Sequence, residues 1–238
     1  MRFTRIMLLL PALLAMHCAL GDIAPYPSPH PVPLPSPAPA QPKAVAQAVV
    51  SMEKADVRIR VTRQGNRAIA DVYAKFFMLC HNAPEYTAPF DTAFPVNYAG
   101  QPGSTRFFHV TVDGTLCHTD PFVWHTTDER QQAATANGYS WMMPIHGGKQ
   151  ALVIVHYACA LPLTHGQAPF MYFLRSGATW DGVIGQESVL VQLGKGMSLA
   201  LPSSAKLKPL RKSARDASWK LVQVKPTEDI HFTILRSR

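Results

Sequence analysis

The chain has 238 residues, of which 47% are hydrophobic and 16% are charged, and its formal net charge is +8 at pH 7. This length is sufficient for one substantial folded domain behind the N-terminal segments described next. The positive excess is modest for the length, which argues against nucleic-acid binding.

The first 21 residues have the three-part pattern of a secretory signal peptide. Arg2 and Arg5 form a basic start, an apolar run follows, and Ala19 and Gly21 place small residues at the −3 and −1 positions of a cleavage site. The apolar stretch, residues 6–20, contains His17 and is shorter than the ~20 residues that span a bilayer. We therefore expect a periplasmic or secreted bacterial protein that is cleaved after Gly21, with a membrane contact only through an uncleaved leader.

A proline-rich segment, residues 22–46, follows the leader. Nearly every second residue between positions 24 and 42 is proline. Proline fixes φ and lacks the amide donor, so the sequence predicts a disordered, extended tether that is neither helix nor sheet.

Alternating apolar and polar residues predict strands through most of the remaining chain, residues 47–238. In residues 56–63, Val57, Ile59 and Val61 face inward and the arginines face water. Residues 67–79 have an apolar even-numbered set, and residues 64–66 between these two strands have hairpin-turn chemistry. Asp113-Gly114 predicts a second hairpin. Further strands are expected at residues 106–112, 151–160, 170–174, 188–193, 219–224 and 230–235.

One segment has helical end signals. Thr126 and Glu129 form a capping box, and Asn137-Gly138 is a plausible stop. We therefore expect a short surface helix near residues 127–137. The fold class predicted from the whole pattern is mainly β, an antiparallel, immunoglobulin-like β-sandwich with that one helix.

Three cysteines remain after cleavage, Cys80, Cys117 and Cys159. In an oxidising compartment they can form one disulfide and leave one thiol, and the sequence does not select the pair. A basic segment, residues 206–220, holds most of the positive excess. It is interpreted as a solvated loop or as a contact for anionic lipid, glycan or phosphate.

Motifs of known catalytic chemistry are missing from the sequence. It has no Gly-x-Ser-x-Gly, no phosphate-binding glycine loop and no His-Glu-x-x-His. Neighbouring Cys and His side chains on a strand point to opposite faces, so Cys80-His81 does not form a metal site alone. We expect scattered surface histidines, no catalytic residues, no metal and no cofactor. The histidines whose convergence would favour an enzyme are His109, His118, His125, His146 and His156.

Aromatic residues beside glycine turns are the candidate binding residues: Tyr139, Trp141, Tyr172 and Trp180. Exposed, such rings stack on sugars or anchor a partner protein. Buried, they close the ends of a sandwich. Trp180 is assigned either role, because the sequence does not decide between them.

Several motifs together resemble a family of exported bacterial proteins of unknown function. They are the Ala55-Asp56-Val57 strand, the Val112-Asp113-Gly114 hairpin, the Tyr139-x-Trp141 pair, the strand at residues 153–157 and the glycine-rich stretch at residues 172–185. The resemblance covers roughly residues 52–195. It implies an exported β-rich domain and assigns no reaction.

The function expected from these observations is a non-enzymatic envelope module that binds another protein or a surface glycan. The alternative is a hydrolase that acts on envelope polymer, with a site assembled from strand-end histidines and acids. Neither the specific ligand nor the oligomeric state follows from the sequence.

We predict that the mature protein begins at Asp22, because the small residues Ala19 and Gly21 flank the cleavage site. Loss of Arg2 and Arg5 would lower the net charge from +8 to +6. Intact-mass measurement of protein exported by its host checks this prediction, and a mass that retains residues 1–21 contradicts it.

Overall fold

The computed structural model describes residues 18–21, 24–25, 48–98, 103–127 and 133–237. Residues 1–17 of the predicted leader and residues 22–23 and 26–46 of the predicted tether lie outside this part. Cys18–Gly21 forms strand β1, and Ala24–Pro25, at the start of the predicted tether, forms strand β2. A chain that begins at Asp22 lacks β1.

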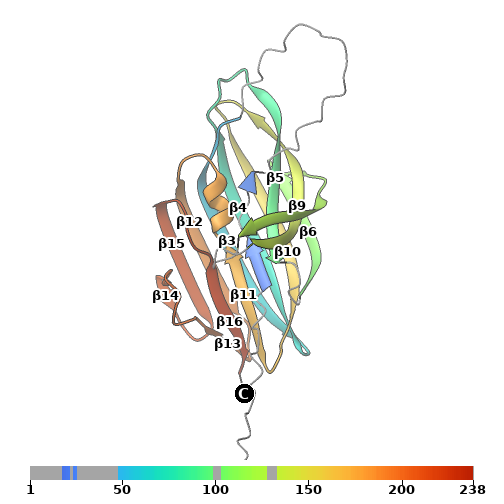
Figure 1. The fold of residues 1–238 in the computed structure, drawn as a ribbon, viewed down its shortest axis with the longest axis vertical. Coiled ribbons are helices and arrows are strands. Elements are labelled where there is room, and N and C mark those ends of the chain that lie inside the picture. Colours follow the sequence, from blue (N-terminus) through green and yellow to red (C-terminus); the bar gives the residue numbers. More distant parts are fainter. Residues whose placement is uncertain (1–17, 22–23, 26–47, 99–102, 128–132, 238) are drawn as a thin grey trace, which may run out of the picture.

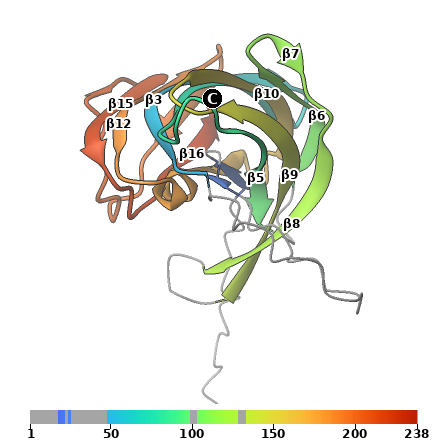
Figure 2. The ribbon, with the colours of Figure 1, turned by 90° about the horizontal axis from the view of Figure 1, so that it is seen from above.

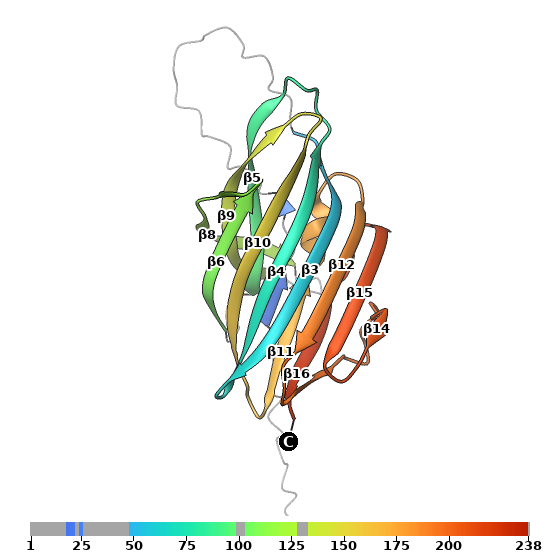
Figure 3. The same cartoon turned by 180° about the vertical axis from the view of Figure 1, so that it is seen from behind.

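Eight strands form one large sheet, which Figure 3 shows face-on. Their spatial order is β14 (Arg211–Lys212), β15 (Asp216–Val224), β12 (Ile184–Leu193), β3 (Val50–Gln64), β4 (Arg67–Cys80), β10 (Gln150–Pro162), β6 (Ser104–Val112) and β7 (Thr115–Leu116).

Two smaller sheets pack against one face of the large sheet, which we call its inner face (Figures 1 and 2). The first contains β1, β11 (Gln167–Phe173), β16 (Ile230–Arg236) and β13 (Met197–Ala200). The second contains β2, β5 (Thr87–Tyr98), β9 (Ala133–His146) and β8 (Asp120–Thr127). A short 3₁₀ helix, η1 (Arg175–Thr179), follows β11.

The predicted strand pattern is confirmed at its centre. Strands β3 and β4 pair over their full length around a two-residue turn, and Gly65 there adopts a φ of +59°. Every even-numbered side chain of β4 from Ala68 to Cys80 is buried. The Asp113-Gly114 hairpin also forms, with positive φ at both residues.

The sandwich expected from the sequence differs from this arrangement in two respects. The described residues form three sheets instead of two, and β12 pairs with β3 in parallel although the prediction was antiparallel. The long connection from β4 around the second small sheet to β12 allows this parallel pairing, because parallel neighbours need a crossover.

The predicted helix near residues 127–137 is wrong. Thr127 ends β8, and residues 133–137 belong to β9 and pair with β8 and β5. Only alanines are apolar in this segment, so a helix there has no face to bury, whereas both neighbouring strands offer backbone partners. The described residues contain no α-helix, and so none that could cross a bilayer.

An aromatic cluster joins the second small sheet to the large one. Phe94 of β5 packs edge-on against Tyr157 of β10 at a ring distance of 5.4 Å. Tyr139 of β9 stacks on Phe108 of β6 at 4.3 Å. Trp141 also lies beside Phe108. These rings fill the space between the sheets, where each contributes both buried area and ring geometry.

Trp180 closes the end of the core next to η1. Its side chain is 3% exposed and stacks on Phe90 of β5 at 5.6 Å. The next residue, Asp181, donates its backbone N–H to the carbonyl of Val50 at the start of β3. Trp180 therefore links η1 to β5 at the point where β3 begins.

We predict that Trp180→Ala lowers the free energy of unfolding by ~3–5 kcal/mol, because the variant leaves a cavity against Phe90. Urea denaturation measures this change. Val183→Ala is the control, since Val183 is 42% exposed and its loss should change stability by less than ~0.5 kcal/mol. A Trp180→Ala protein as stable as the control would contradict the core role.

Glu187 is a carboxyl group in the core. It lies on β12 with Ala55 and Leu221 as its register partners, its side chain is fully buried, and neither oxygen has a hydrogen-bond partner in the described residues. Burial raises the pKa of Glu187 from 4.5 to about 8. The folded protein thus keeps a proton at neutral pH that the unfolded chain releases.

The pH dependence of stability follows from this difference. Protonated Glu187 contributes to the free energy of unfolding. This contribution is fully present below the unfolded pKa of 4.5 and is lost as the pH rises through the folded pKa of about 8. We predict that Glu187→Gln, which cannot ionise, raises the melting temperature relative to wild type progressively from about pH 5 to about pH 9. Differential scanning fluorimetry measures it, and Glu85→Gln, in an exposed turn, should leave the pH profile unchanged.

Candidate functional site

On the face of the large sheet opposite the core, its outer face, no other sheet of the described residues lies in front (Figure 3). Near the β14 edge it carries a hollow of about 510 Å³, which we call the outer hollow. Its floor consists of outward-facing side chains of β3, β4, β12 and β15, and Leu210 and Arg211 form one wall. Volumes of this order are typical of small-ligand sites.

Strand register places the floor residues in rows across the sheet. One row runs from Ser218 through Leu190 and Arg58 to Tyr73, and the next runs from Lys220 through Ser188 and Asp56 to Lys75. Neighbouring strands are ~4.8 Å apart, so side chains in one row are within reach of a single bound molecule.

Four cationic side chains line the outer hollow: Arg58, Lys75, Arg211 and Lys220. None of the four forms an ion pair with a described residue. The carboxylate in the lining, Asp56, is held by Lys54 at 2.6 Å. Lys75 lies over the ring of Tyr73 at 5.7 Å. The hollow therefore has a positive potential that the protein itself does not neutralise.

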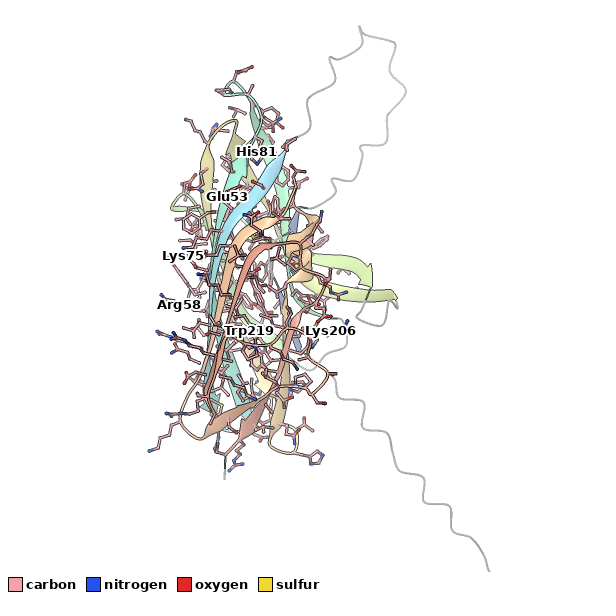
Figure 4. All side chains as sticks on the ribbon, turned by 90° about the vertical axis from the view of Figure 1, so that its left-hand side faces the viewer. Glu53, Arg58, Lys75, His81, Lys206 and Trp219 are labelled. Atoms are coloured by element: carbon pink, nitrogen blue, oxygen red, sulfur yellow. The ribbon has the colours of Figure 1, made fainter. Side chains whose placement is uncertain are left out.

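The wall of the outer hollow comes from the basic segment, residues 206–220. Leu210 donates its backbone N–H to Ser218 at 2.7 Å, and Arg211 pairs with Ser218 in the ladder of β14 and β15. The indole Nε1 of Trp219 donates to the carbonyl of Leu207 at 3.4 Å. These bonds hold Arg211 beside the floor of the outer hollow. Part of the predicted basic segment therefore lines the same recess as Arg58 and Lys75. Figure 4 shows Arg58 and Lys75 on the outer face.

The aromatic candidate residues lie elsewhere. Trp141, Tyr172 and Trp180 are at most 3% exposed, and Tyr139 is half-buried against Phe108. The sequence left two roles open for these rings, exposed binding residues or buried residues that close the core. The structure shows Trp141, Tyr172 and Trp180 in the buried role. Tyr73, which the sequence did not single out, is the ring that borders the outer hollow.

The histidines mostly scatter. His118, just before β8, pairs with Asp120 at 3.2 Å, and His146 at the end of β9 contacts Thr87 at the start of β5 at 3.2 Å. The side chain of His125 lies outside the described part of the structure. His109 and His156 are register partners on the outer face, and His156 contacts Asp71 at 3.0 Å. No group of three potential metal ligands occurs among the described residues.

No disulfide joins Cys80, Cys117 and Cys159 to one another in the structure. Cys159 pairs with Ala70 on β4, and Cys80 lies ten residues farther along the same strand. At ~3.3 Å per residue they are ~33 Å apart, far beyond the ~7 Å limit for a disulfide. A bond between Cys80 and Cys159 is therefore excluded by the register of the sheet.

A serine, a glutamate and a histidine meet where β3 begins and β4 ends. Ser51 Oγ donates to Glu53 Oε1 at 2.6 Å and lies 2.8 Å from His81 Nε2. Figure 4 shows Glu53 and His81 near the same end of the sheet. A serine nucleophile needs its proton accepted by an imidazole that a carboxylate orients. Here the hydroxyl hydrogen goes to the carboxylate, so His81 donates to the hydroxyl and the order of the three groups is not catalytic.

No protein-family model matches the sequence, and no curated protein matches it. Among solved structures, the chain is similar to a "putative nutrient binding protein" of Legionella pneumophila, with a TM-score of 0.62 and 16% identity over 93% of this chain and 72% of that one. Leukotriene A4 hydrolase from Saccharomyces cerevisiae gives a TM-score of 0.37 and 7% identity, and 32% of its chain is covered. The first similarity shows a shared fold, and the second carries no argument.

Proposed function

We propose that the protein is an exported, non-enzymatic module of the cell envelope that binds an acidic glycan in the outer hollow. The observation that carries this proposal is the set of four cations, Arg58, Lys75, Arg211 and Lys220, which line one recess without an ion pair in the described part of the chain. Carboxylate, sulfate or phosphate groups on a sugar chain are the natural partners of such a set.

The shape of the site favours a glycan over a protein. A stable protein interface buries ~800 Å² on each side and centres on apolar and aromatic anchors. The outer hollow is instead a recess in which Tyr73, Leu190 and Leu210 provide apolar surface between the cations. Sugar rings present an apolar face and hydroxyl edges, so such a lining suits them.

Two further observations support a binding role. The Legionella protein of similar fold is described as a "putative nutrient binding protein", which is a binding role and not a reaction. The leader and tether predicted from the sequence would place the domain in the envelope, where acidic glycans occur. The competing hydrolase has the Ser51–Glu53–His81 contact as its best support, and the order of those groups does not suit nucleophilic attack.

The test uses three polymers with the purified mature protein. Polygalacturonate is the carboxylated glycan, dextran is its uncharged counterpart, and poly-L-glutamate is an acidic chain without sugar. Isothermal titration calorimetry should show binding of polygalacturonate that weakens with added salt, because screening reduces the attraction. Dextran should not bind, and poly-L-glutamate should bind less tightly than polygalacturonate.

Matched variants locate the site. The double variant Arg58→Ala/Lys75→Ala should weaken polygalacturonate binding by about tenfold or more, since each charge-assisted hydrogen bond contributes ~1.5–3 kcal/mol. Arg67→Ala/Lys195→Ala removes the same charge from exposed positions outside the hollow and should have little effect. Equal losses in the two double variants would contradict a defined site, and tighter binding of poly-L-glutamate would replace the glycan with an acidic protein.

A further inference from the structure

A second hollow, of about 490 Å³, lies on the other side of the same sheet edge. Three segments that are far apart in the sequence form it: the first residue of η1, the connection between β13 and β14, and the turn into β16. We define this second hollow by five of its polar lining residues, Arg175, Lys206, Glu228, Asp229 and His231. Figure 4 shows Lys206 on the opposite side of Trp219 from Arg58 and Lys75.

A buried ion pair forms one wall of the second hollow. The side chain of Asp229 is fully buried and accepts two hydrogen bonds from Arg175, one from its backbone N–H at 2.9 Å and one from Nε at 2.9 Å. Burial raises the pKa of Asp229, whereas Arg175 and His231 act to lower it. The backbone bond anchors the start of η1 to Asp229, and the charge-assisted Nε bond keeps the guanidinium of Arg175 beside the hollow.

A second ion pair lies at the mouth. Lys206 Nζ contacts Glu228 Oε1 at 2.7 Å, and these side chains are 84% and 25% exposed. Because the Lys206 end of this pair lies in solvent, a ligand at the mouth can reach Lys206 and compete for it with Glu228. The separated pair would offer one cation and one carboxylate to opposite ends of the same molecule.

The balance of charges selects the chemical class of the ligand. Arg175 and Lys206 would repel a simple cation, and Glu228 and Asp229 would repel a simple anion. An apolar molecule would desolvate these groups without replacing their hydrogen bonds. A small molecule that carries both charges satisfies the two ends of the lining together, and Ser204 and Thr227 add hydroxyl partners.

We propose that the second hollow binds a small zwitterion of the free α-amino acid type. Its carboxylate lies toward Lys206 and Arg175, and its ammonium group lies toward Glu228. This site is separate from the outer hollow, and it does not depend on the glycan proposal.

The experiment titrates the purified mature protein with the standard free L-amino acids, one at a time, by isothermal titration calorimetry near neutral pH. The amino acid that binds most tightly is then compared with its N-acetyl derivative, which lacks the ammonium group, and with its methyl ester, which lacks the carboxylate. Each derivative should bind about tenfold more weakly or worse, because each leaves one charged side chain unpaired.

Three single variants test the location. Lys206→Ala and Glu228→Gln should each weaken binding by about tenfold, since each removes the partner of one charged group. Lys208→Ala removes an exposed cation two residues away that is outside the hollow and should bind as wild type does. The melting temperature of each variant is measured first. Glu228→Gln keeps the shape of the side chain and serves if Lys206→Ala is unstable.

The results separate this proposal from the glycan one. Arg58→Ala/Lys75→Ala should retain amino-acid binding, and Lys206→Ala should retain polygalacturonate binding. The proposal is overturned if no amino acid binds, if the N-acetyl derivative or the ester binds as well as the parent, or if Lys208→Ala loses as much affinity as Lys206→Ala.

Discussion

Side-chain alternation along three long neighbouring strands, β3, β4 and β10, determines most of this structure. Each strand turns successive side chains to opposite faces, so burying one face leaves every second residue outside. On β4 the inward set runs from Ala68 to Cys80 without a polar residue, and the two small sheets cover it. The outward set is then available for ligand contacts. Arg58, Tyr73 and Lys75 border the outer hollow because Val57, Val72 and Ala74 fill the core.

The same alternation decides what could be predicted from the sequence. It gave the positions of β3, β4, β6 and β10 and the outward direction of Arg58. Prediction from the alternation failed where local sequence signals for a helix end compete with pairing between strands. Asn137-Gly138 is a plausible helix end, yet Gly138 lies in β9, where a Cβ would be 2.1 Å from the carbonyl oxygen of Phe94. The glycine is required by close strand contact, and that requirement becomes visible only when the partner strand is known.

The outer hollow was beyond prediction for a related reason. Its four cations come from β3, β4, β14 and β15, and the parallel register of β12 with β3 brings them together. Nothing local in the sequence encodes a parallel pairing between segments that are over a hundred residues apart. Trp180 presents the opposite case. Its glycine-rich surroundings left both exposure and burial open, and the stacking on Phe90 that buries it comes from β5, a strand that was not among those predicted.

The connection between β13 and β14 forms part of both hollows, with Lys206 and Leu207 beside the second and Leu210 beside the outer one. Such sharing could couple the two sites, because allostery needs an element with two arrangements that both ligands bias. The contacts of Leu207 argue against such coupling between the two hollows. Its carbonyl accepts the indole N–H of Trp219, its side chain packs against the core, and Trp219 itself is 3% exposed. A shift of Leu207 would break this hydrogen bond and disturb the packing of a buried tryptophan. The segment therefore divides the two hollows, and each is expected to bind its ligand independently of the other.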